Sequence, residues 1–367
     1  MNTNYYFIDY FNESPPIIQV VWMTSGVFFI IIIPLIFYLK YLRRHLRKKE
    51  RVTAEYENEY ESYLITYLYS GNEDDTFSSE QQLIINELKK CVADPFKRKI
   101  IILTLLKLRN EISGEIAESI DTLFIKLGLL RYSLAKLRNK KWDIIAIGIR
   151  ELTQFKIKAV HKIIMNNINH PKREVRKEMQ LYLVHLYAFK GLDFLDILET
   201  QLSEWDQIQL LEVLQRLENQ NISNIKYWLN SSNDSVVIFA LKLAKIYNQF
   251  EAKNELIELL YHINKKIRLE SIHVLSYLNA LEAKEILKTN IEKRSPEEQI
   301  AFFKMMENLY ESSDESFLME YIHHEIFEIK VSTLKILKIL NNDKFNLLKL
   351  ESSEPQFLRI VNFIENN

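Results

Sequence analysis

The apolar residues of this chain follow two patterns. From Ile17 to Leu39 they form a stretch without any charged residue. From Trp142 onwards they recur at helical spacing within a unit of about 31 residues. The first pattern predicts a helix long enough to cross a membrane, and the second predicts a series of packed helix pairs.

A helix over residues 17–39 would be about 34 Å long at about 1.5 Å per residue, more than the roughly 30 Å hydrocarbon core of a bilayer. Trp22 lies near one end and Tyr38 near the other, where aromatic residues favour the membrane interface. A buried core helix is the alternative. The near-continuous apolar run over residues 27–39 favours a transmembrane helix.

The flanks of this helix predict its orientation. Residues 1–16 contain no lysine or arginine, and no small-residue cleavage site follows Leu39, which disfavours a cleaved signal peptide. Seven cations come directly afterwards: Lys40, Arg43, Arg44, Arg47, Lys48, Lys49 and Arg51. Because cytoplasmic flanks carry the excess of lysine and arginine, we expect a single-pass anchor in the cytoplasmic (inner) membrane. Residues 1–16 would form a short extracytoplasmic N-terminus, and the rest of the chain would be cytoplasmic.

The seven cations form a membrane-surface basic cluster that has two interpretations. One is a topology signal that also contacts lipid headgroups. The other is a recruitment of anionic lipid beyond that role, since each cation near an acidic leaflet adds about 1 kcal/mol. The sequence does not separate the two.

Residues 40–79 are predicted to form a basic juxtamembrane helical arm and a polar loop. Apolar positions over residues 54–68 follow helical spacing, so we expect this stripe to pack on the first downstream helices. A homodimeric coiled coil is the alternative. Ser78 and Gln81 form a capping-box pattern that opens the next helix. Residues 80–141 are also helical but do not follow the later period, and they are interpreted as an irregular N-terminal cap.

Residues 142–367 contain a repeat. Seven segments align, 30 or 31 residues apart, at the lead positions Ile144, Val175, Asp206, Val236, Ile267, Glu298 and Ile329. Four, five and eight positions after each lead the chain is mostly small or apolar, and these offsets lie on one helix face. Shorter amphipathic helices lie between. One helix pair cannot bury both of its stripes, so we expect neighbouring pairs to stack into a right-handed α-solenoid.

Two of these segments resemble HEAT repeats, in which an apolar residue followed by arginine opens the second helix. The matching pairs are residues 175–176 and 267–268, whereas Asp206 and Glu298 stand where the family has an aliphatic residue. Together with the anchor, the chain is similar to membrane-anchored bacterial proteins with a cytoplasmic HEAT domain. The resemblance implies an all-α fold and protein–protein scaffolding.

Composition disfavours several kinds of site. The chain has only six glycines, which argues against phosphate-binding loops. Cys91 is the single cysteine, which excludes an intramolecular disulfide and a cysteine-based zinc module. The chain outside the basic cluster is net acidic, which disfavours nucleic-acid binding. His323 and His324 point about 100° apart on a helix, unfavourable for one metal ion. We therefore predict no catalytic, metal-binding or cofactor-binding residue and no cofactor.

Three tryptophans lie near the repeat junctions: Trp142, Trp205 and Trp228. We expect them to pack between repeats. Exposed binding hot spots are the alternative.

These features favour a membrane-anchored cytoplasmic scaffold or adaptor, rather than an enzyme, that binds a protein partner through the solenoid surface. The partner's identity is not encoded in any motif, and a membrane enzyme is one example. One alternative is an enzyme on a HEAT-like frame, of the DNA glycosylase or lyase type, because a fold does not determine function. Another is a self-assembling membrane structural protein, a homo-oligomer formed through the arm and span.

Overall fold

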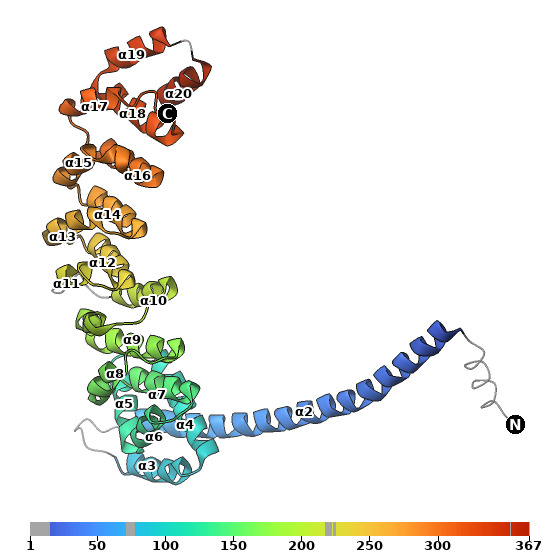
Figure 1. Cartoon of the computed structure of the whole chain (residues 1–367). Helices are drawn as coiled ribbons and strands as arrows, with labels where there is room; N and C mark the ends of the chain where they lie inside the picture. The colour runs from blue at the N-terminus through green and yellow to red at the C-terminus, as the bar shows by residue number, and fades with distance from the viewer. Residues whose placement is uncertain (1–14, 71–77, 217–221, 223–224, 353, 367) are drawn as a thin grey trace. The chain divides into compact units, whose positions relative to one another are not determined.

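The computed structural model describes residues 15–70, 78–216, 222, 225–352 and 354–366, and every regular element among them is a helix. The predicted all-α fold is confirmed (Figure 1). The chain forms two compact units, Met1–Leu134 and Ala135–Asn367. Most of the predicted extracytoplasmic N-terminus and of the predicted polar loop lies outside the described residues.

The first unit contains a single long helix, α2 (Pro16–Tyr69). Its apolar segment, residues 17–39, is exposed almost throughout, and by length and composition the helix could cross a membrane. The helix continues through the basic cluster and the arm without a break. The apolar segment and the arm therefore belong to one helix.

The arm packs on the helices that follow it, as the sequence predicts. Tyr60, Leu64 and Tyr67 are buried on one side of α2. The Gln81 side chain donates to the Tyr67 carbonyl at 2.9 Å, and the predicted Ser78–Gln81 capping box is present. Part of the stripe that a homodimeric coiled coil would use is thus covered within the chain by α3 (Ser79–Val92), α4 (Pro95–Glu111) and α5 (Glu115–Lys126).

The second unit begins within α6 (Leu130–Leu137) and repeats a long helix at the predicted period (Figure 1). Each predicted lead position is the third residue of its helix, and the residues four and eight positions later are buried in all seven. The period therefore located both the helices and their buried faces. These long helices are α7 (Trp142–Gln154), α9 (Arg173–Tyr187), α10 (Glu204–Leu214), α12 (Asp234–Ile246), α14 (Lys265–Tyr277), α16 (Pro296–Leu309) and α18 (Phe327–Leu340).

The first member of each pair is much shorter. These elements are α8 (His161–Asn166), α11 (Ile225–Leu229), α13 (Lys253–Glu258), α15 (Leu281–Lys288) and α17 (Glu315–Met319). Before α10 the place of the short helix is taken by a 3₁₀ segment, η2 (Ala188–Ile197). The chain ends with α19 (Asn342–Glu351) and α20 (Pro355–Asn366).

The two lead positions without an aliphatic residue carry buried carboxylates that link repeats. Asp206 and Glu298 each complete a capping box at the start of their own helix, with Ser203 and Ser295. Each also receives an arginine from the preceding long helix: Arg173 contacts Asp206 at 3.2 Å, and Arg268 contacts Glu298 at 2.7 Å. The departures from the HEAT pattern are therefore sites where a buried carboxylate, paired with an arginine of the preceding repeat, stands in place of an apolar residue.

Arginine at the fourth position of a long helix has a recurring role. Arg176 and Arg268 each donate from Nη1 to the carbonyls six and five residues earlier, at 2.7 to 3.1 Å. Arg98 of α4 does the same with Val92 and Ala93. Ile101, Ile102 and Leu105 follow Arg98 by three, four and seven positions and are buried. The residues at the same offsets from Arg176 and Arg268 are buried as well. Helix α4, which lies in the predicted irregular cap, therefore has the same register as the repeats. The 31-residue period did not identify it because α5 and α6 lie between α4 and α7 in the chain.

Candidate interaction surface

Several histidines stabilise turns rather than forming a reactive cluster. In His170, His262 and His324 the Nδ1 atom accepts the backbone N–H two residues later at 3.1 Å, just before a long helix begins. Asn139 accepts the same kind of hydrogen bond before α7. Within the described part of the chain, no group of three or more histidine, cysteine, aspartate or glutamate residues is arranged to hold a metal ion.

The structure places the predicted basic cluster on an exposed part of α2. All seven side chains, Lys40 to Arg51, are exposed. Among the described residues, only Arg51 has an ion-pair partner in this group, Glu55 at 3.2 Å. The cluster is therefore open to an anionic surface along its length.

The three tryptophans near the repeat junctions have different environments. Trp228 is 1% exposed, and its Nε1 donates to Asp196 at 2.7 Å across the repeat junction. Trp142 and Trp205 are 42% and 59% exposed. The predicted inter-repeat packing is correct for Trp228 and wrong for Trp142 and Trp205, because these two occupy the first two positions of their helices, ahead of the buried stripe.

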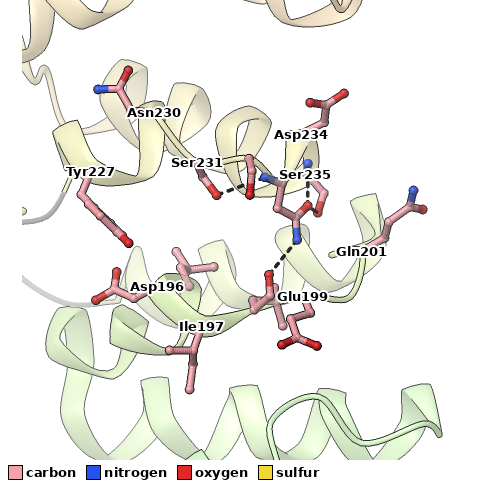
Figure 2. Close-up of a pocket in the computed structure, with 13 residues that line it drawn as sticks. Asp196, Ile197, Glu199, Gln201, Tyr227, Asn230, Ser231, Asp234 and Ser235 are labelled. Atoms are coloured by element: carbon pink, nitrogen blue, oxygen red, sulfur yellow. Dashed lines mark hydrogen bonds between the residues drawn. The ribbon is translucent and has the colours of Figure 1, made fainter.

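A groove of about 1000 Å³ lies between two repeats of the second unit (Figure 2). One wall is the end of η2 and the extended segment after it, residues 195–201. The other wall is Tyr227 of α11 with residues 230–235, which lead into α12. The groove exists because an extended segment, rather than a helix, connects η2 to α10.

Asparagine side chains hold that extended segment in place from both sides. Asn169 donates to the Ile197 carbonyl at 2.8 Å and accepts the Glu199 N–H at 3.0 Å. On the other side, Asn233 donates to the carbonyls of Leu198 and Thr200 at 2.9 and 3.0 Å. The segment is thus fixed without regular secondary structure, and its outer edge stays open.

The groove is acidic with an apolar rim. Asp196, Glu199 and Asp234 line it, and no lysine or arginine is among its described lining residues. Tyr227 and Ile197 at the rim are 63% and 48% exposed. Such a surface can pair with cationic side chains while the tyrosine and isoleucine contact apolar parts of a chain. This groove is not predicted by the sequence. The only signal was the polar run Asn230 to Asn233, which reads as an ordinary turn.

No protein-family model and no curated protein matches the chain. Several solved structures are similar to it. One is an engineered protein, at 12% identity and a TM-score of 0.36, with 84% of this chain and 98% of that chain covered. Human deoxyhypusine hydroxylase in complex with glycerol matches at 13% identity and a TM-score of 0.29, covering 80% and 99%.

A structure of microtubule polymerases with tumor overexpressed gene domain arrays matches at 11% identity and a TM-score of 0.25, covering 83% of this chain and 89% of that chain. The chain is similar to these proteins in its all-helical fold alone.

Proposed function

We propose that this protein is a membrane-anchored scaffold, without an enzymatic activity of its own, that holds a protein partner at the inner face of the cytoplasmic membrane. In this proposal residues 17–39 span the bilayer, residues 1–16 lie outside the cytoplasm, and both units after the span are cytoplasmic. The observation that carries it is the continuity of α2, which joins an exposed apolar segment to an arm that packs on the folded part of the first unit through Tyr60, Leu64 and Tyr67. A soluble protein would not leave such a segment uncovered.

The groove lined by Asp196, Glu199 and Asp234 is the proposed contact surface for the partner. The carboxylates of Asp196 and Glu199, with no lysine or arginine among the described lining residues, favour a basic segment. The Asp234 carboxylate instead accepts a hydrogen bond from Asn264 of the next repeat at 2.6 Å. The exposed Tyr227 supplies the kind of aromatic contact that dominates interface energies. We therefore expect the partner to present lysine or arginine next to an apolar side chain.

Site-specific crosslinking in the producing cell tests this function. Benzoylphenylalanine in place of Tyr227 should give one defined adduct after ultraviolet exposure. The same replacement at Tyr261 is the matched control, because that tyrosine has the same exposed fraction, 63%, and does not line the groove. Equal adducts at both positions, or none at Tyr227, would contradict a partner in the groove.

The anchoring has its own test. A carbonate wash at high pH strips peripheral proteins from membranes but leaves spanning ones. We expect the full chain to stay in the membrane pellet, and a variant with Ile31→Lys and Ile32→Lys to lose membrane insertion, because charge at the bilayer centre is unfavourable. Release of the unaltered chain by carbonate would rule out the anchor.

A further inference from the structure

Six of the seven juxtamembrane cations lie on one face of α2. At about 100° per residue they fall within an arc of about 140°, whereas Lys49 lies on the other side. We call these six the basic stripe: Lys40, Arg43, Arg44, Arg47, Lys48 and Arg51. All of them are exposed, and the helix is continuous through the whole stripe.

The folded part of the first unit lies on the opposite face of the same helix. Tyr60, Leu64 and Tyr67 are the buried residues of α2, and on an ideal helix they lie at roughly 180° from the middle of the stripe. Helices α3, α4 and α5 pack on that face. One side of α2 therefore packs against protein, and the other carries exposed positive charge, of which only Arg51 has an ion-pair partner among the described residues.

The topology signal alone does not explain this arrangement. Orientation depends on the number of cations near the end of a span, not on the helix face that carries them. Arg51 lies about 18 Å beyond Leu39 along the helix axis, whereas the headgroup region of one leaflet is only about 5–7 Å thick. In an upright helix, Arg47 and Arg51 would project past the headgroups into water. They reach lipid only if the helix leans towards its basic side.

We propose that α2 leaves the membrane at a lean, with the basic stripe against anionic lipid headgroups and the folded part of the first unit held on the side facing away from the bilayer. This inference rests on the proposed membrane anchoring. The occupant is a phospholipid surface because the stripe continues directly from the apolar segment. Beyond Arg51 the arm turns acidic, with Glu55, Glu57 and Glu59 and no further cation, so the contact ends there.

Two labelling positions distinguish a leaning helix from an upright one. In a Cys91→Ala background, Lys49→Cys and Arg51→Cys each remove one cation and each take one bimane label. Position 49 is nearer the bilayer along the axis, and position 51 is on the stripe. The labelled full chains are reconstituted in vesicles of equal parts phosphatidylcholine and phosphatidylglycerol, with a nitroxide quencher on the lipid headgroup.

A lean predicts that the label at position 51 loses a larger fraction of its fluorescence than the label at position 49, although it lies farther along the helix. The difference should shrink in pure phosphatidylcholine and at high salt, where the Debye length falls to about 3 Å at 1 M. In the Arg51→Cys background, Arg47→Gln should reduce quenching and the matched Lys49→Gln should not.

Three results would count against the lean. Quenching at position 49 equal to or above that at position 51 would overturn the lean while leaving the anchor intact. A difference between the two labels that is as large in neutral as in anionic vesicles would overturn the role of lipid charge, and would leave an acidic protein segment as the ligand of the stripe. Loss of the unlabelled chain from carbonate-washed vesicles would overturn the anchoring itself, and the lean with it.

Discussion

Arg268 of α14 forms a bidentate ion pair with Glu298, the third residue of α16 in the next repeat. The Nε–Oε1 and Nη2–Oε2 distances are 2.7 and 3.1 Å. The Glu298 side chain is completely buried, and the Ser295 hydroxyl donates to it at 2.8 Å. Burial alone would raise the pKa of this carboxyl group, but the hydrogen bonds from Arg268 and Ser295 outweigh that effect and lower the pKa to about 2. The ion pair therefore links two repeats, and the buried Glu298 carboxylate is kept ionised by its hydrogen bonds from Arg268 and Ser295.

Replacing Glu298 with glutamine should destabilise the second unit by about 3 kcal/mol, because breaking a buried pair leaves the Arg268 charge without a carboxylate. The matched control is Glu297→Gln at the neighbouring position. Glu297 pairs with Lys265 at 2.6 Å, but both side chains are about half exposed, so the control should change little. Urea unfolding of the full chain in detergent, followed by circular dichroism, measures both. Equal midpoints for the two variants would contradict the proposed role of the pair.

The same carboxyl group predicts a pH dependence. Its pKa in the folded protein, about 2, lies below the usual value of 4.5. The folded state thus gains stability from the ionised group above the usual value, and loses it as the pH falls from there through the folded value. Unfolding free energies measured from neutral pH into this acid range should fall steeply for the unaltered chain and less steeply for Glu298→Gln. Parallel profiles would show that Glu298 titrates normally.

The repeat period predicted more of the fold than of the candidate site. A helix face that is buried must carry apolar residues at fixed offsets. The positions of the seven long helices of the second unit, and their register, could therefore be predicted from the sequence. Asp206 and Glu298 looked like departures because their arginine partners come from another repeat, about 30 residues away. The groove was missed for a different reason. It depends on η2 and an extended segment replacing an α-helix, and no periodic signal marks the place where a helix fails to form.

One of the six glycines, Gly191, lies where the backbone of α9 leaves no room for a side chain. A Cβ atom at Gly191 would lie 2.2 Å from the Leu183 carbonyl oxygen, a distance that requires the backbone to move. We expect Gly191→Ala to destabilise the protein by about 3 kcal/mol, at the upper end of overpacking effects. Gly128→Ala is the control, because a Cβ there meets open space and only the backbone angle, φ 73°, is unfavourable. That strain is about 1 kcal/mol.

Thermal unfolding of the two alanine variants separates crowding from backbone strain. A larger loss for Gly128→Ala than for Gly191→Ala would mean that the segment around Gly191 can move away from α9 without penalty.

The walls of the groove depend on Asn233, and a matched asparagine tests this. Asn233 and Asn264 each begin a long helix by accepting a backbone N–H two residues later, from Ser235 and Lys266 at 3.1 and 2.9 Å. Replacement of either with alanine should lose about 1 kcal/mol of capping. Only Asn233 also donates to the carbonyls of Leu198 and Thr200. Asn233→Ala should therefore free the extended segment as well.

Hydrogen exchange at the Leu202 amide reports that release. This N–H donates to the Ser235 hydroxyl at 2.9 Å, and that hydroxyl in turn donates to Asn233 Oδ1 at 2.6 Å. Exchange at Leu202 should accelerate in Asn233→Ala and stay unchanged in Asn264→Ala, and the Tyr227 crosslink should weaken only in the first variant. If both variants accelerate exchange equally, loss of the helix cap is sufficient and the contacts to the segment do not hold the groove. If exchange accelerates but the crosslink persists, the partner binds through Tyr227 and the α11 side alone.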